Sequence, residues 1–261
     1  MQFLDLTLPS PAENLALDEA LLLAADGPVI PNSTNPEVKH ERAEFAPPTD
    51  RLDSEVLRIW RPTNPFIVLG RSSHYCQEIH VQQASQRSIP VVRRFSGGAT
   101  VVVGSGCLLY SLLIRLDSAP GLRLLDVAHR FVMHRMLEAI LRIEPTVCFR
   151  GTCDLTLLGR KFSGNSLRVG RNWMLYHGTL LLDMQLSLVD ELLKHPPREP
   201  DYRKGRSHAD FLTNLPIDES ALVEAIRGVW QAEQALANIP LSFVPMLVQQ
   251  KYGRDEWNLQ R

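Results

Sequence analysis

The sequence predicts an α+β fold, in which a mixed or antiparallel β-sheet is flanked by helices. Short β-branched and apolar runs, bounded by turn residues, fill the middle of the chain, and amphipathic helical patterns lie on either side of them. This segregation of strands and helices is typical of α+β architecture. With 261 residues, 44% of them hydrophobic, we expect residues 1–261 to form a single domain with a sizeable core.

The first elements are a short strand and a helix. Residues 2–6 have the character of a strand. The stretch Ser10-Pro11-Ala12-Glu13 has the form of a capping box with proline at the first helical position. The following residues separate into an apolar face and an acidic face with Asp18 and Glu19, so the pattern predicts a helix to about Ala25.

The segment 26–53 differs in composition from its neighbours. It is rich in Pro, Asn, Ser, Thr and Glu and has no apolar period. Such a composition predicts a flexible loop, and we interpret it as an insertion into the fold.

The rest of the chain alternates between strand and helix patterns. Strands are predicted at 56–60, 66–70, 90–94, 99–104, 107–114, 146–149, 154–158, 161–168 and 172–183. Helices are predicted at 79–87, 124–142, 187–194 and 219–235.

The overall composition excludes several classes of function. The 28 basic and 29 acidic residues give a net charge of −1, so no global field favours nucleic acid or an anionic membrane. No apolar run is long enough to span a bilayer, and the first residues lack a signal core, which predicts a cytoplasmic protein. The four cysteines form no Cys-x-x-Cys pair, so we expect reduced thiols and no zinc site.

The most informative motif is a glycine turn between two strand patterns, Arg93-Arg94-Phe95-Ser96-Gly97-Gly98-Ala99. Small residues let the backbone approach a ligand, and successive free N–H groups in such a turn can hold an anion. Strand alternation sends the two arginines to opposite faces, so we expect one in a pocket and the other at the surface. Arg94, which is closer to the turn, is the candidate for the pocket.

Two further clusters follow the glycine turn, and with it they carry a family resemblance. They are Gly159-Arg160-Lys161-Phe162-Ser163-Gly164 and Tyr176-His177-Gly178-Thr179-Leu180. In their order and spacing they resemble the lipoate–protein ligase A family, whose catalytic domain shares its fold with biotin protein ligases. The resemblance extends from Asn14-Leu15-Ala16-Leu17-Asp18 through Trp60-Arg61 and Val68-Leu69-Gly70-Arg71 to Leu212-Thr213-Asn214-Leu215.

The resemblance implies an enzyme that attaches lipoate or octanoate to a lysine of lipoyl-carrying proteins. Such acceptors are the E2 subunits of 2-oxoacid dehydrogenases and the glycine-cleavage H protein. Because a carboxylate does not react with an amine at neutral pH, ATP with Mg²⁺ first converts the acid into an acyl-adenylate. The protein then contributes mainly positioning and charge neutralisation.

The resemblance also assigns residues to the site. The essential lysine of the family falls on Lys161, whose ammonium would neutralise the α-phosphate, although a lysine after glycine in a hairpin is ordinarily solvated. Asp154 is a candidate Mg²⁺ ligand or, equally, a turn aspartate. The substrate- and adenylate-binding positions are Arg71, Arg94, Ser96, Gly97, Gly98, Ala99, Asp154, Ser163, Gly164, His177, Gly178 and Thr179.

The sequence departs from the ligase pattern in ways that leave alternatives open. Ala99 replaces a third glycine, and Val103-Gly104 replace a His-Asp pair. The tail beyond Pro216 is too short for the large C-terminal accessory domain of related ligases, so we expect that domain to be absent or supplied by a separate subunit.

Cysteines near Lys161 suggest a second function on the same fold. Relatives that transfer octanoyl groups from acyl carrier protein, or from another lipoyl protein, use a thiol and need no ATP, because a thioester is already activated. Cys148 or Cys153 is the candidate nucleophile, although each alone is more typical of a small buried residue. A third alternative is a degenerate protein that binds an acyl ligand or a carrier protein without catalysis.

Overall fold

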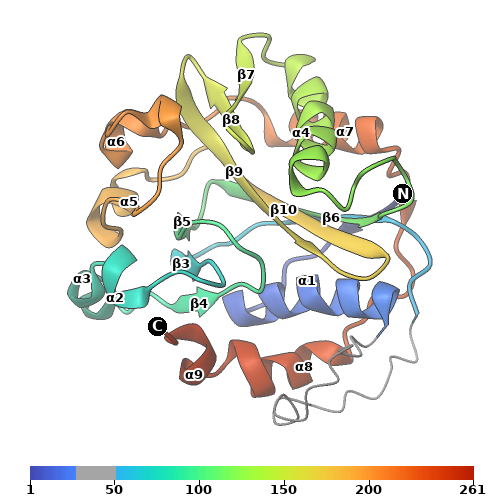
Figure 1. Ribbon diagram of the computed structural model, residues 1–261, viewed down its shortest axis with the longest axis horizontal. Coiled ribbons are helices and arrows are strands. Elements are labelled where there is room, and N and C mark those ends of the chain that lie inside the picture. Colours follow the sequence, from blue (N-terminus) through green and yellow to red (C-terminus); the bar gives the residue numbers. More distant parts are fainter. Residues whose placement is uncertain (28–50) are drawn as a thin grey trace.

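The computed structural model describes residues 1–27 and 51–261, and it contains two β-sheets flanked by helices (Figure 1). The predicted insertion, 26–53, lies almost entirely outside the described residues. The larger sheet has the order β11 (Gln234–Ala235), β1 (Gln2–Asp5), β2 (Val56–Trp60), β6 (Cys107–Arg115), β10 (Trp173–Leu181), β9 (Arg160–Val169), β8 (Asp154–Leu157) and β7 (Val147–Arg150). The α+β class and the mixed sheet predicted from the sequence are confirmed.

Strand direction changes across the larger sheet. Strand β1 pairs in parallel with both β11 and β2, and every pair from β2 to β7 is antiparallel. The smaller sheet has β3 (Phe66–Leu69) at its centre, parallel to β4 (Val91–Arg93) and antiparallel to β5 (Val101–Val103). The glycine turn therefore connects β4 to β5 within the smaller sheet.

Helices cover both faces of the larger sheet. On one face lies α1 (Pro11–Asp26), which packs against β6, β10 and α8 (Phe243–Leu247). On the other lies α4 (Leu125–Leu141), which packs against β7, β8 and α7 (Glu219–Trp230). Side chains of β10 alternate between the two: Tyr176 bonds to His129 of α4, whereas His177 bonds to Asp18 of α1.

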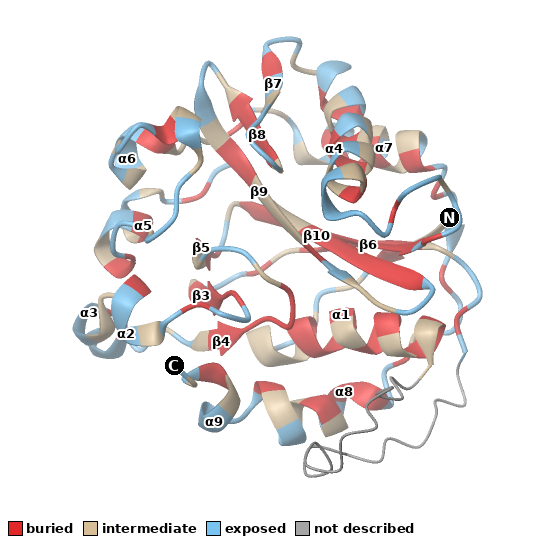
Figure 2. Ribbon diagram, viewed as in Figure 1, coloured by how far each residue is buried: buried red, intermediate tan, exposed pale blue. Residues whose placement is uncertain are grey.

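The shorter helices lie around the smaller sheet, beside β9 and near the carboxyl end of the chain. They are α2 (Tyr75–Glu78), α3 (Val81–Gln86), α5 (Ser187–Leu192), η2 (Asp201–Arg203), α6 (His208–Phe211), η3 (Val248–Tyr252) and α9 (Asp255–Asn258). Among the helices of the described residues, none is both long and apolar enough to cross a membrane. Figure 2 shows that the middle strands of the larger sheet are the most deeply buried, and eight of the nine residues of β6 are buried.

Local signals in the sequence set several element boundaries. The predicted capping box is present, with the Ser10 hydroxyl accepting from the Glu13 main chain, and α1 ends at Gly27 with φ +74°. The predicted helix 79–87 is shorter, at Val81–Gln86 (α3), because Ile79 and His80 are not helical; a separate short helix, α2, precedes them. The predicted helix 219–235 stops at Trp230, because Gln231 adopts a left-handed conformation that caps it.

A buried ion pair connects α1 to the larger sheet. Arg58, in the middle of β2, is fully buried, and its guanidinium lies 2.7 Å from the Asp18 carboxylate. It also donates to the side chain of Asn14 at 2.6 Å. Burial acts to raise the pKa of Asp18, but Arg58, together with hydrogen bonds from His177 and Ser111, outweighs it and holds that pKa below its usual value.

Asp18→Ala should lower the free energy of unfolding by about 3–5 kcal/mol, because Arg58 would remain buried without its counter-charge. Urea denaturation at neutral pH measures the loss. Since the pKa of Asp18 is depressed, the stabilisation is present above the ordinary carboxyl range and is lost as the pH falls below it. Asp117→Ala, which breaks the exposed pair with Arg115, should leave the urea midpoint nearly unchanged. Equal losses in the two variants would contradict a special role for the buried pair.

Candidate active site

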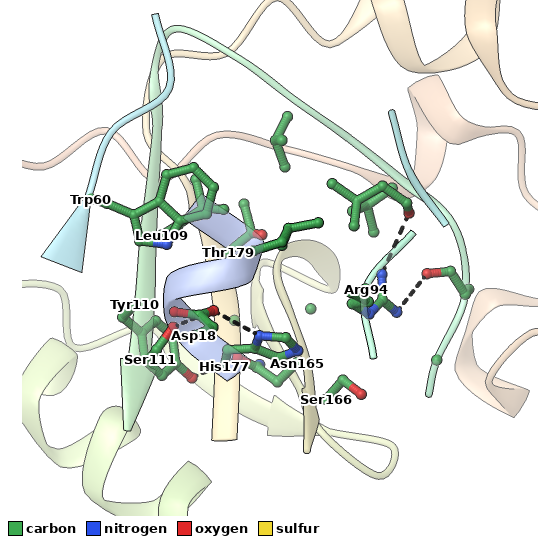
Figure 3. Close-up of a pocket in the computed structure, with 18 of the residues that line it drawn as sticks. Asp18, Trp60, Arg94, Leu109, Tyr110, Ser111, Asn165, Ser166, His177 and Thr179 are labelled. Carbon is green, nitrogen blue, oxygen red and sulfur yellow. Dashed lines mark hydrogen bonds and ion pairs between the residues drawn. The ribbon is translucent and has the colours of Figure 1, made fainter. Parts of the chain in front are cut away.

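A pocket, here called the central pocket, lies between the α1 side of the larger sheet and the smaller sheet. Its apolar wall comes from both sheets and from α1, and consists of Leu15, Trp60, Val68, Val101, Val103 and Leu109. Figure 3 shows Trp60 and Leu109 together on one side, with Asp18, Ser111 and His177 clustered apart from them. The pocket thus has an apolar part, suited to a hydrocarbon chain, and a polar part.

His177 is fixed by hydrogen bonds at both ring nitrogens. Its Nδ1 lies 3.2 Å from the Asp18 carboxylate and its Nε2 lies 2.6 Å from the Ser96 hydroxyl. Because an ionised carboxylate only accepts, Nδ1 carries the proton and Nε2 accepts from Ser96. Ser96 is itself buried and does not line the pocket. His177 therefore shapes the polar part of the pocket, with its ring held between Asp18 and Ser96.

Arg94 lines the central pocket and stabilises the glycine turn by hydrogen bonds to its backbone. Its guanidinium donates to the main-chain oxygens of Gly97 and Ala99, at 2.6 and 2.9 Å from Nη2. Gly98 has φ +91°, and a Cβ there would lie 2.7 Å from the same Nη2, so this position requires glycine. Ala99 has no such positive φ, so alanine fits at this position without backbone strain.

Arg93 corrects an expectation from the sequence. The two arginines do point to different places, but Arg93 is fully buried rather than exposed at the surface. Its guanidinium donates to the carbonyls of Gly70, Ser73 and Gln260, each at 2.8 Å. The turn after β3 supplies two of these acceptors and the carboxyl-terminal segment the third, whose proximity could not be read from the strand pattern.

Lys161 lies where the central pocket meets a second one, here called the adjoining pocket. The two share Ala99, Val101, Lys161, Gly164 and Thr179. The adjoining pocket continues along β5 and β9 to the segment 196–212. The Lys161 ammonium lies 2.7 Å from Asp154 Oδ1, and the Tyr202 hydroxyl donates to Asp154 Oδ2 at 2.8 Å. This chain of contacts fixes the ammonium between the two pockets.

The other residues expected in the site are distributed over both pockets. Gly164, Gly178 and Thr179 line the central pocket, whereas Ser163 lines only the adjoining one. Gly178 must be glycine, because a Cβ there would lie 1.7 Å from the side-chain oxygen of Asn165. Gly97 contributes its carbonyl to Arg94 and also accepts from Ser166.

Arg71 lies away from Lys161. It lines neither the central nor the adjoining pocket, and its side chain faces a separate cavity behind the glycine turn. Its main-chain N–H donates to Ser96 O at 2.9 Å, which connects it to the turn through the backbone alone.

Asp154 does not form a metal site by itself. Both of its carboxylate oxygens are engaged, by Lys161 and by Tyr202. Across residues 1–27 and 51–261, no group of three or more His, Cys, Asp or Glu side chains is arranged to hold a metal ion. These residues therefore form no all-protein Mg²⁺ cage, and Asp154 as a ligand of a nucleotide-bound Mg²⁺ stays a prediction.

The two candidate thiols lie outside both pockets. Cys148 is exposed on β7, the edge strand of the larger sheet. Cys153 donates to Asn165 O at 3.1 Å, and burial, with a contribution from the Asp154 charge, raises the pKa of its thiol to about 11. A thiol with so high a pKa carries little thiolate at neutral pH.

Several residues that organise the site were not singled out from the sequence. Asp18 was assigned to an acidic face of α1, yet it is buried, and its spacing from Asn14 and Leu22 places it on the inward side of the helix. Arg58, a charge inside an otherwise apolar strand, was a visible signal of a buried ion pair. Tyr202 gave no local signal, because it meets Asp154 across 48 residues.

Comparison with known proteins places this site in a family. A family model described as the lipoyl protein ligase A/B catalytic domain matches residues 10–218. The chain belongs to this family. It therefore shares the catalytic domain of lipoate–protein ligases and octanoyltransferases.

Individual relatives differ in activity and in length. Octanoyltransferase LipM of Brevibacillus brevis is 24% identical over 97% of this chain and 96% of its own length. Lipoate-protein ligase LplJ of Bacillus subtilis is 29% identical over 63% of this chain, which spans 49% of that protein. In structure, the chain resembles a bi-partite lipoate protein ligase from Thermoplasma acidophilum, with a TM-score of 0.76, 20% identity and coverage of 100% of this chain and 97% of that one.

Tyr202→Phe tests whether the contact chain to Lys161 matters for turnover. Losing one hydrogen bond to a charged group should lower the rate of acyl transfer to a lipoyl domain about tenfold, with little change in KM for the acyl substrate. Steady-state kinetics measure the two effects separately. If Tyr202 serves only to pack against Phe211, phenylalanine will preserve the rate.

Proposed function

We propose that this protein is an ATP-dependent lipoate–protein ligase, which converts lipoate or octanoate into an acyl-adenylate and transfers it to a lysine of a lipoyl domain. The observation that carries the proposal is the position of Lys161, whose ammonium lies where an apolar pocket meets a second pocket. Neither thiol lines these pockets. The site therefore favours neutralisation of an anion over attack by a cysteine.

In the proposed first step, the acyl chain occupies the apolar wall of the central pocket and its carboxylate reaches Lys161. The nucleotide occupies the adjoining pocket. A carboxylate oxygen attacks the α-phosphorus of ATP, the bond to the pyrophosphate oxygen breaks, and pyrophosphate leaves. Lys161 neutralises charge that builds up on the α-phosphate, and Asp154 with Tyr202 keeps its ammonium in place.

In the proposed second step, the uncharged lysine amine of the acceptor attacks the acyl carbonyl. The carbonyl–oxygen bond to AMP breaks, AMP leaves with the electron pair, and the amine releases its proton. We assign His177 to the wall of the central pocket, where Asp18 and the buried Ser96 hold its ring, and assign no residue as the base for this proton. E2 subunits of 2-oxoacid dehydrogenases and the glycine-cleavage H protein are the acceptors that we propose.

A second candidate is a cysteine-dependent octanoyltransferase. It is favoured by the match to octanoyltransferase LipM over nearly the whole of both chains. Cys153 is the nearer candidate, because it directly precedes Asp154, whose carboxylate contacts the Lys161 ammonium. For this activity, a movement of the loop around Cys153 would have to release the thiol from Asn165 O and lower its pKa.

An accessory subunit is part of the ligase proposal. The chain spans about half of lipoate-protein ligase LplJ, whereas it spans almost all of the Thermoplasma chain that is described as bi-partite. We therefore propose that a separate polypeptide completes the second step. Adenylate formation tests the first step without that polypeptide.

Three single variants separate the two candidate functions. Lys161→Ala should abolish ATP-dependent modification of a lipoyl domain, because the anionic centre loses its counter-charge. Cys148→Ala and Cys153→Ala should each retain most of the activity, because neither thiol reaches the pockets. The measurements, after incubation with lipoate and MgATP, are the formation of lipoyl-AMP and the intact mass of the lipoyl domain; without the separate polypeptide, the adenylate alone is expected.

The same variants with octanoyl-acyl carrier protein, without ATP, form the comparison. If the lipoyl domain gains the mass of an octanoyl group only in the incubation with octanoyl-acyl carrier protein, and one cysteine variant loses this gain, the protein is a transferase and the ligase is rejected. If the lipoyl domain gains no mass in either incubation, detection of lipoyl-AMP in the incubation with lipoate and MgATP still supports the ligase and its separate subunit. Absence of that adenylate, too, would reject the ligase.

A further inference from the structure

Glu78, the last residue of α2, is a buried acid that the proposed reaction does not use. Its side chain lines neither the central nor the adjoining pocket. Because a buried carboxylate is costly unless it is paired or hydrogen-bonded, the groups that compensate its charge indicate its role.

The donors to Glu78 come from two segments of the chain. In the segment that follows β3, the Ser73 hydroxyl donates to Oε2 at 3.0 Å and the His74 main-chain N–H donates to Oε1 at 2.9 Å. At the end of the glycine turn, the Thr100 hydroxyl donates to Oε2 at 2.6 Å and the Thr100 N–H donates to it at 3.3 Å. Burial acts to raise the pKa of Glu78, but these hydrogen bonds outweigh it and hold that pKa below its usual value. The carboxylate is therefore ionised at neutral pH and joins the two segments.

The segment after β3 also packs directly against the glycine turn. A Cβ at Gly70 would lie 1.9 Å from Gly98 O, so the two backbones are in contact. A main-chain N–H of the same segment donates to Ser96 O at 2.9 Å. These contacts support the start and the middle of the turn. Glu78 extends the support to the end of the turn, through Thr100.

Thr100 belongs to the wall of the adjoining pocket. Its neighbours in sequence, Ala99 and Val101, line both pockets, as Lys161 does. A shift of Thr100 would therefore move the wall that the two pockets share.

Only a carboxylate satisfies the groups around Glu78. Each of its oxygens faces a main-chain N–H, that of His74 or that of Thr100, and a carboxylate only accepts. An amide of the same shape would turn its NH₂ group towards one of these N–H groups, whichever way it is oriented. It would also remove a negative charge that acts on Arg94, the other side chain that holds the turn. Burial lowers the pKa of Arg94 to about 10, and the charge of Glu78 opposes this effect.

We propose that Glu78 is a positioning residue, which holds Thr100 and thereby sets the wall of the adjoining pocket beside Lys161. It acts through Thr100 and does not itself contact the substrate. The proposal rests on the proposed function in one respect: the nucleotide occupies the adjoining pocket, so loss of the contact should act mainly on the use of ATP. The effect on the glycine turn does not depend on which acyl-transfer activity the enzyme has.

Hydrogen exchange of the main-chain amides of residues 94–103, measured by mass spectrometry, tests the position of the turn without any substrate. Glu78→Gln should speed this exchange about tenfold or more, because the contact to Thr100 is lost. Ser73→Ala is the matched control, since it removes a hydrogen bond to the same carboxylate and leaves Thr100 in place. Its exchange should stay within about twofold of wild type. Equal exchange in Glu78→Gln and wild type, or an equal rise in Ser73→Ala, would overturn the proposal.

The kinetics of lipoyl-AMP formation test the consequence for the site. Glu78→Gln and Thr100→Val should each raise KM for ATP about five- to tenfold, with a smaller change in KM for lipoate, whereas a general loss of stability would lower the apparent kcat instead. Thr100→Ser, which keeps the hydroxyl, should remain within about twofold of wild type. The double variant of Glu78→Gln with Thr100→Val should be no worse than Glu78→Gln alone, because both changes remove the same contact.

Two kinetic results would contradict the proposal. One is that the effects of Glu78→Gln and Thr100→Val multiply in the double variant, and the other is that both single variants keep the wild-type KM for ATP. If wild-type protein forms no lipoyl-AMP, the proposed ligase fails, and the hydrogen exchange of Glu78→Gln against Ser73→Ala alone decides the role of Glu78.

Discussion

The arrangement of the site depends on the buried ion pair between Arg58 and Asp18. Arg58 comes from the middle of the larger sheet and Asp18 from the helix that covers it, so the pair fixes the helix to the sheet at one point. The same carboxylate accepts from Ser111 and from His177, and His177 in turn holds Ser96 of the glycine turn. A single buried charge thereby connects the helix, the larger sheet and the turn of the smaller sheet. Because such a charge is costly without its partner, these elements must assemble together.

The glycine turn and Lys161 are held in place by two separate sets of side-chain contacts. The Arg94 guanidinium donates to two carbonyls of the turn, so it stabilises the backbone of the turn and also lines the pocket. Lys161 is held from the other side by Asp154 and Tyr202. Both sets of contacts are made between protein groups alone, so they orient the turn and the Lys161 ammonium for the substrate.

Local features of this fold could be predicted from the sequence, and long-range ones could not. The capping box at Ser10 and the strand pattern around Lys161 depend on neighbouring residues, and both are present. Arg93 was expected at the surface, because nothing near it in sequence shows that the turn after β3 and the carboxyl-terminal segment supply its acceptors. Asp18 was placed on an acidic face, since helical periodicity alone does not show which acidic residue has a buried arginine opposite it. The family resemblance supplied Lys161, whereas the contacts that orient its ammonium had to come from the structure.

The most direct test of the proposed ligase is isotope exchange between pyrophosphate and ATP. Reversible formation of an acyl-adenylate returns labelled pyrophosphate to ATP only when the acid substrate is present, and it requires no acceptor protein. The account predicts lipoate-dependent exchange by the wild-type protein and none by Lys161→Ala. Failure of the wild-type protein to exchange label with either lipoate or octanoate, while it transfers octanoyl groups from acyl carrier protein, would contradict it.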